Sequence, residues 1–182
     1  MTFDDITHDG RLWAVRYDGE DDNVLYDLID KWNDVLWLRL FFKQNWADMC
    51  SFYSVVDVNQ AIEDTIEDAD VPERKLLDAS SSANLDELFH PLENFRTSDA
   101  LLGKEKARPK VNGRHSSWLR LYAIKLSGGV HVITGGAIKL TLKMEERDHT
   151  RAELAKLEKV RNFLLSEGVI DDDSFIEYMN ML

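Results

Sequence analysis

Basic and aromatic side chains that could act on a phosphate ester are grouped in the second half of the chain. Arg120 and Tyr122 are two residues apart in an alternating stretch, so a strand would place both on one face. Lys139, Arg147 and His149 follow. Such side chains suit cleavage of RNA without a metal, because a 2′-oxygen must lose a proton, the phosphorane charge must be offset and the leaving oxygen must gain a proton. Arg120, Lys139, Arg147 and His149 are therefore the candidate catalytic residues.

The charge of the chain is unevenly distributed. The formal net charge is −12, from 22 basic and 34 acidic side chains, and taken as a whole it argues against a nucleic-acid partner. Residues 1–90 hold 7 basic and 21 acidic side chains, whereas residues 101–143 hold nine basic side chains and one acid, Glu105. This basic segment predicts either a surface for an anion or RNA, or a face that docks on the acidic half of the molecule. Arg120 is likewise expected either to contact an anion or RNA or to pair with an acid of the N-terminal half.

The candidate RNA-contacting residues share a basic or phenolic side chain within the basic segment: Lys104, Lys106, Arg108, Lys110, Arg114, Tyr122 and Lys143. No metal and no cofactor is expected, because the five histidines are scattered and no P-loop or dinucleotide-binding glycine pattern is present. Cys50 is the single cysteine, which excludes an intramolecular disulfide and a multi-cysteine metal site. Its aromatic neighbours predict a buried thiol.

The first part of the chain is predicted to be mainly helical. Alternation and turn residues indicate one early strand, and longer stretches with helical apolar spacing follow it. Pro72 is expected to break a helix or to start a new one. The predicted elements are a strand at 10–19, helices at 21–43, 57–69 and 84–89, and a loop at 96–116.

The pattern changes to strands after residue 116. Residues 117–126 alternate, Ser127-Gly128-Gly129 is typical of a hairpin turn, and 130–134 form the return strand. Gly135-Gly136 interrupts that strand and predicts a bulge or the close approach of another backbone. Thr150 with Glu153 three residues later predicts a capping box that begins the last long helix.

The order of these elements predicts an α+β fold, with a small, mostly antiparallel sheet packed by helices. We expect an acidic, mainly helical portion with one early strand at 1–80 and an α+β portion at 81–182, joined in one continuous unit. No apolar run approaches the ~18 residues that span a bilayer, and the N-terminus lacks the basic and apolar features of a secretory signal. The expectation is a soluble, cytoplasmic protein without a membrane partner.

Three motifs of the second half resemble the RelE/HigB-like, phage-derived toxins of type II toxin–antitoxin pairs. They are Trp118-Leu119-Arg120-Leu121-Tyr122, then Val130-His131-Val132-Ile133-Thr134-Gly135-Gly136, then His149-Thr150-x-x-Glu153-Leu154. The resemblance covers about residues 89–165. The chain departs from the family in a longer basic loop, in Arg151 where a proline commonly follows the threonine, and in the acidic N-terminal portion.

The resemblance implies a compact α+β fold and metal-independent, ribosome-dependent cleavage of mRNA, inhibited by a cognate antitoxin. Arg120 matches the strand arginine associated with stabilising the phosphate. Tyr122 matches a structural or catalytic neighbour of that arginine, and His149 lies where the family often has a basic residue. Lys139, Lys143 and Arg147 fall in the basic loop.

Two hypotheses follow. The first is a toxin-like mRNA endoribonuclease with mRNA or the ribosome as its target and a helix-turn-helix antitoxin as its partner. The second is a non-catalytic interaction protein that keeps the toxin-like fold and binds a protein or a nucleic acid.

Overall fold

The computed structural model describes residues 1–55, 57–77, 85–92, 102–108 and 116–181, with the backbone alone for 71–77. The described strands form one six-stranded sheet in the order β1-β2-β6-β5-β4-β3. The strands are β1 (Thr2–Asp5), β2 (Leu12–Arg16), β3 (Phe89–Pro91), β4 (Gly103–Ala107), β5 (Leu119–Lys125) and β6 (His131–Ile138). All neighbours pair antiparallel except β2 and β6, which are parallel. The predicted α+β fold with a mostly antiparallel sheet is confirmed.

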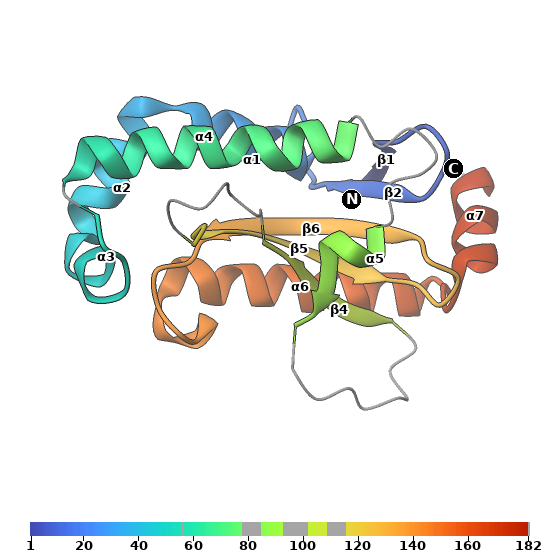
Figure 1. Cartoon of the computed structure of the whole chain (residues 1–182). Coiled ribbons are helices and arrows are strands. Elements are labelled where there is room, and N and C mark those ends of the chain that lie inside the picture. Colours follow the sequence, from blue (N-terminus) through green and yellow to red (C-terminus); the bar gives the residue numbers. More distant parts are fainter. Residues whose placement is uncertain (56, 78–84, 93–101, 109–115, 182) are drawn as a thin grey trace.

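Helices cover both faces of this sheet (Figure 1). α1 and α4 lie along one face and α6 along the other, while α7 stands at the end of the sheet near the C-terminus. The helices are α1 (Val24–Asn33), α2 (Val35–Gln44), α3 (Trp46–Phe52), α4 (Val58–Leu77), α5 (Leu85–Leu88), the 3₁₀ helix η1 (Met144–Glu146), α6 (Asp148–Ser166) and α7 (Asp172–Met181). Among the described residues, no helix combines the length and the apolar character needed to cross a bilayer.

The helix predicted over 21–43 is divided at Asp34. The backbone of Asp34 is extended, and its carboxylate accepts hydrogen bonds from the backbone N–H groups of Leu36 (2.9 Å) and Trp37 (3.1 Å). An Asp in this position caps a new helix, so α1 ends and α2 begins there. The chain changes direction at this point, so α2 leads from the end of α1 to α3 at one end of the molecule (Figure 1).

Two further expectations about secondary structure were wrong. The backbone of α4 continues through Pro72 to Leu77, so no break occurs at the proline; a proline removes one bond of the helical ladder, which a long helix can lose. β4 lies inside the predicted loop 96–116, because pairing with β5 orders a segment of low strand propensity. The other residues of that stretch, apart from 102, 108 and 116, lie outside the described residues.

The sheet joins the two predicted portions of the chain. β2, from the acidic portion 1–80, pairs with β6 of the portion 81–182, with Leu12 opposite His131 and Ala14 opposite Ile133. α1 packs against β6 from above (Figure 1). The acidic portion therefore contributes two strands and one helical layer to the same core.

The hairpin of β5 and β6 contains a bulge, as the Gly135-Gly136 pair predicts. Tyr122 lies opposite Gly135, but Ala123 lies opposite Ile133, so Thr134 is the extra residue. The hydroxyl of Tyr17 donates to the carbonyl of Thr134 (2.6 Å) and satisfies this interrupted part of the ladder.

Gly135, the first glycine after the bulge, lets α6 approach the sheet closely. The buried carboxylate of Glu153 accepts the N–H of Gly136 (3.0 Å) and also binds Lys156 (2.8 Å). A Cβ on Gly135 would lie 1.9 Å from Oε2 of Glu153. The predicted capping box is therefore wrong: α6 begins at Asp148, the hydroxyl of Thr150 donates to carbonyls of the preceding turn, and Glu153 binds the sheet instead.

We expect Gly135→Ala to lower the free energy of unfolding by about 1–3 kcal/mol, because the displaced carboxylate leaves the buried N–H of Gly136 without its acceptor. Gly103→Ala is the matched control, since the nearest atom to its Cβ would be 3.7 Å away. Urea unfolding measures both. Equal stability of the two variants would contradict this role of Glu153.

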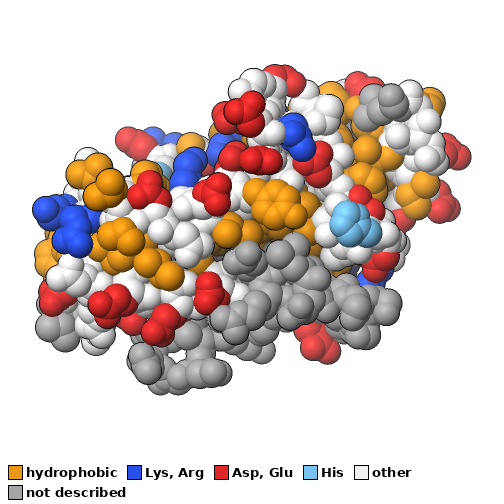
Figure 2. Space-filling model, turned by 90° about the horizontal axis from the view of Figure 1, so that it is seen from above, with side chains coloured by type: hydrophobic (Ala, Val, Ile, Leu, Met, Phe, Trp, Pro, Cys, Tyr) orange, Lys and Arg blue, Asp and Glu red, His pale blue; other side chains and the backbone are white. Residues whose placement is uncertain are grey.

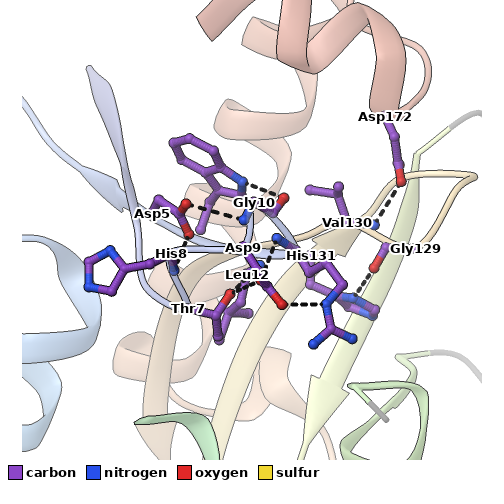
Figure 3. A network of polar contacts seen from close by, with 12 residues as sticks. Asp5, Thr7, His8, Asp9, Gly10, Leu12, Gly129, Val130, His131 and Asp172 are labelled. Carbon is purple, nitrogen blue, oxygen red and sulfur yellow. Dashed lines mark hydrogen bonds and ion pairs between the residues drawn. The ribbon is translucent and has the colours of Figure 1, made fainter. Parts of the chain in front are cut away.

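A second polar network holds the turn between β5 and β6 (Figure 3). Asp172 at the start of α7 accepts the backbone N–H groups of Gly128 (3.1 Å) and Val130 (3.2 Å). Nδ1 of His131 lies 2.9 Å from the carbonyl oxygen of Gly129, and the ring stacks on Phe89. His131 is fully buried, and this burial lowers its pKa from 6.5 to about 4.

The buried His131 makes the fold sensitive to acid. The unfolded chain binds a proton at His131 more readily than the folded chain, so stability falls as the pH drops from about 6.5 toward about 4. The loss approaches about 3 kcal/mol, since one pKa unit corresponds to about 1.4 kcal/mol. Urea unfolding across this pH range should show that the free energy of unfolding of His131→Asn depends less on pH than that of the wild type. His8→Asn, a change at an exposed position with φ 57°, should keep the wild-type slope.

Candidate functional site

A basic pocket of about 890 Å³ lies on the sheet face that α6 covers, beside the N-terminal part of that helix. Its basic and phenolic lining consists of Lys106, Arg108, Arg120, Tyr122, Lys139 and Lys143. His90 and Glu145 complete the polar lining, and leucines and a methionine supply the rest. Glu145 is the one acid among these lining residues, so the pocket is strongly cationic.

Strand alternation and the bulge together bring the basic side chains to one face. Lys106 lies opposite Tyr122, and Arg120 lies opposite Ala137, so the side chains of these pairs point the same way. Lys139 is two residues beyond Ala137, and its backbone N–H continues the ladder to the carbonyl of Trp118 (2.8 Å). Without the extra residue in β6, the alternation would place Lys139 on the opposite face.

The cations around the pocket donate to backbone carbonyls. These bonds run from Lys106 to Leu92 (2.9 Å), from Arg108 to Ser117 (3.0 Å), from Arg120 to Ser117 (2.8 Å) and Leu119 (2.6 Å), and from Lys139 to Leu142 (2.6 Å). Among the described residues, none of these four cations pairs with a carboxylate. A carbonyl satisfies a donor but does not neutralise its charge, so the pocket keeps a positive potential.

The acidic half neutralises other basic side chains instead. Asp48 of α3 binds Arg147 through two bonds (2.6 and 2.5 Å), and Asp86 pairs with Lys125. Figure 2 shows the face of the α1 and α4 layer, whose described part carries many acidic side chains and few basic ones. The acidic and cationic surfaces are thus separated, and Arg120 pairs with no acid among the described residues.

Burial and mutual repulsion shift the pKa values in the pocket. Burial lowers the pKa of Lys106, and the charge of Arg120 lowers it further. Burial also lowers the pKa of Lys139, and Arg120 and Lys106 add to this, whereas Glu146 and Glu145 oppose it. For Arg120, burial is the first cause of a lowered pKa and the neighbouring Arg108 is the second. Both lysines therefore release a proton more readily than an exposed lysine does.

The hydroxyl of Tyr122 is buried in the pocket wall and has no hydrogen-bond partner among the described residues. Tyr122 is 1% exposed, and burial raises the pKa of its phenol. The group therefore stays protonated as a neutral donor. An unpartnered buried hydroxyl costs stability unless a ligand accepts its hydrogen bond.

Tyr53 holds the pocket against the helical layer. Its hydroxyl donates to the carbonyl of Lys139 (3.1 Å) and lies beside the guanidinium of Arg120, while its ring meets the edge of Trp118 (centroids 5.2 Å apart). The sequence analysis does not identify Tyr53 as a site residue. The aromatic pair Phe52-Tyr53 at the end of a helix was the available signal, but it does not reveal what the hydroxyl contacts.

The structure brings only some of the predicted residues together. Arg120, Lys139, Lys106, Arg108, Tyr122 and Lys143 line the pocket, whereas Arg147 binds Asp48 and Lys104 binds Glu158 (2.5 Å). His149 lies with Nε2 3.0 Å from the carbonyl oxygen of Ile138 and its ring against Phe41. Of the four predicted catalytic residues, Arg120 and Lys139 line the pocket, whereas Arg147 and His149, at the start of α6, contact α3 and α2. Lys110 and Arg114 lie outside the described residues.

No protein-family model, no curated protein and no solved structure matches this chain. Among the described residues, no group of three or more His, Cys, Asp or Glu side chains is arranged to hold a metal ion. Cys50 is exposed rather than buried as expected, since it lies on the outer side of α3. The basic pocket is therefore the candidate functional site of this protein.

We expect Tyr122→Phe to raise the free energy of unfolding by about 1 kcal/mol, because it removes a buried hydroxyl that no described residue binds and keeps the ring. Tyr53→Phe is the matched control and should lower stability by a similar amount, because it removes the bond to the carbonyl of Lys139. Thermal or urea unfolding distinguishes them. A loss of stability in both variants would mean that the Tyr122 hydroxyl is satisfied within the folded protein.

Proposed function

We propose that this protein is a toxin-like mRNA endoribonuclease and that the basic pocket is its site. The observation that carries the proposal is that Lys106, Arg108, Arg120 and Lys139 surround the unpartnered hydroxyl of Tyr122 without a carboxylate partner among the described residues. An RNA phosphodiester supplies the missing negative charge and accepts hydrogen bonds from all of these groups. The resemblance to RelE/HigB-like toxins supports the same assignment.

The two lysines suit the two proton transfers. Lys106 serves as the base, because burial and Arg120 both lower its pKa and no acid among the described residues opposes them. Lys139 serves as the acid, because Glu146 and Glu145 help it to keep its proton. The assignment follows the rule that neighbouring charges set which of two groups gives a proton and which takes one.

In the proposed reaction, the 2′-hydroxyl gives its proton to the neutral amine of Lys106 and its oxygen attacks the phosphorus. The P–O5′ bond breaks as the O2′–P bond forms, and O5′ takes a proton from the ammonium of Lys139. Arg108 and Arg120 offset the phosphorane charge, and Tyr122 donates to a non-bridging oxygen. The products are a 2′,3′-cyclic phosphate end and a 5′-hydroxyl end.

A toxin of this kind acts on mRNA in the cytoplasm, on the ribosome, and needs an inhibitor. We propose that a helix-turn-helix antitoxin binds this protein and blocks the pocket. These cations, which pair with no carboxylate of the described residues, favour an inhibitor segment that carries carboxylates, since these would neutralise Lys106, Arg108, Arg120 and Lys139 in place of the phosphate.

Binding without cleavage is the second candidate, and the positions of Arg147 and His149 favour it. Both side chains are engaged outside the pocket, so two groups expected to act on RNA are occupied elsewhere. In that case the protein is a non-catalytic interaction protein that holds a nucleic acid or an acidic partner protein in the same pocket.

Induced expression in bacteria tests the first candidate. We expect growth arrest and mRNA fragments with 5′-hydroxyl ends from the wild type. Arg120→Ala and Lys106→Ala should slow cleavage by roughly 100-fold or more, because each removes a group that stabilises or forms the transition state. With purified ribosomes and mRNA, the wild-type rate should rise with pH as Lys106 loses its proton.

Lys31→Ala is the control, because it removes one positive charge from the exposed surface of α1. It should arrest growth as the wild type does. Harmless expression of folded wild-type protein, with RNA bound but intact, would reject cleavage and leave the second candidate. If the Arg120→Ala variant arrests growth as strongly as the wild type, another site is responsible for the arrest.

A further inference from the structure

A second pocket of about 490 Å³ adjoins the first. The two share Arg108, Arg120, Lys139 and Leu142 as lining residues, so the cations stand between two cavities. Among the described residues, no acidic side chain lines the second pocket. A phosphate held by these cations would therefore have space on two sides for the groups attached to it.

The wall of the second pocket contains an accessible aromatic ring. Phe52 ends α3 and is 47% exposed, although its ring would ordinarily be buried in a core. Ser54, Ser116 and Thr141 add hydroxyl groups to the same lining. An open aromatic ring, hydroxyl groups and neighbouring cations form the combination that recognises an unpaired nucleotide, by stacking, hydrogen bonds and phosphate contacts.

The position of Phe52 relative to the cations is fixed by its neighbour in the chain. Tyr53 binds the carbonyl of Lys139, lies beside Arg120 and packs on Trp118, whose indole N–H donates to the hydroxyl of Thr65 (2.8 Å). The end of α3 is thereby attached to Lys139, which follows β6, and through Trp118 to α4. Phe52 therefore belongs to a formed wall that is ready to receive a ligand.

We propose that the second pocket binds one unpaired nucleoside of RNA next to the phosphate held by the cations, with its base stacked on Phe52. This inference rests on the proposed RNA-binding function and adds that the substrate is single-stranded at this position. It also gives the acidic N-terminal portion a part in the site, since Phe52, Tyr53 and Ser54 all belong to it.

Binding of a single-stranded RNA oligonucleotide to the full-length protein tests the inference. The oligonucleotide carries 2′-O-methyl groups so that it cannot be cleaved, and fluorescence anisotropy gives its dissociation constant. Phe52→Ala should weaken binding by roughly 5- to 100-fold, as expected for the loss of one base–aromatic stack. Phe52→Trp should restore it. Tyr26→Ala, which removes another partly exposed ring, on α1 and outside both pockets, is the matched control.

A series of oligonucleotides with one abasic site each locates the stacked base. One abasic position should weaken binding to the wild type and have little further effect on Phe52→Ala. The same RNA annealed to its complement should bind without a Phe52 effect. Inorganic phosphate should stabilise the wild type and Phe52→Ala equally against thermal unfolding, because the cations remain.

Equal affinity of wild type and Phe52→Ala for the oligonucleotide would overturn the nucleoside pocket while leaving the proposed RNA-binding function intact. A parallel loss of phosphate stabilisation in Phe52→Ala would also overturn it, because the ring would then act through the cations. If the wild type binds phosphate but no RNA, the proposed function fails as well. If Phe52→Ala is less stable than the wild type, RNA binding by Phe52→Trp decides whether an aromatic ring at this position binds the base.

Discussion

The approach of α6 to β6 at Gly135 and Gly136 is the contact on which the rest of the structure depends. Only a residue without a Cβ at position 135 leaves room for the carboxylate of Glu153, which accepts the backbone N–H of Gly136. The extra residue, Thr134, shifts the alternation of β6 by one position and turns Lys139 toward Arg120 and Tyr122. One local irregularity thus fixes the last long helix and assembles the cationic face.

The pocket is built at a cost to stability. Like charges lie close together, the lysine pKa values are lowered, and the hydroxyl of Tyr122 is buried without a partner in the described part of the chain. A fold selected only for stability would place a carboxylate here, as it does for Arg147 and Lys125. An unneutralised set of donors is stabilised when an anion binds, because binding to the folded state alone shifts the folding equilibrium. The local cost is therefore the physical basis of the proposed function.

The acidic portion of the chain has two separate roles in this arrangement. Its two strands extend the sheet, and α1 packs against the sheet. Phe52 at the end of α3 and the following residue, Tyr53, line the second pocket, and Asp48 of α3 binds Arg147. The acids of this portion do not cover the pocket within the described residues. A net negative chain can therefore present a cationic pocket, since the range of charge interactions at physiological salt is about 8 Å.

The sequence by itself determined the α+β class, the β5–β6 hairpin, the bulge at the glycine pair and the basic segment that forms the pocket, because period, turn residues and charge are local properties. It also identified Arg120, Lys106, Arg108 and Lys139 as anion-binding candidates, although their use on RNA stays a prediction. Tertiary structure alone decided that Glu153 binds the sheet instead of capping α6, that Arg147 and His149 face α2 and α3, and that Tyr53 joins the site. These outcomes depend on which distant backbone a side chain meets, and local sequence spacing does not contain that information.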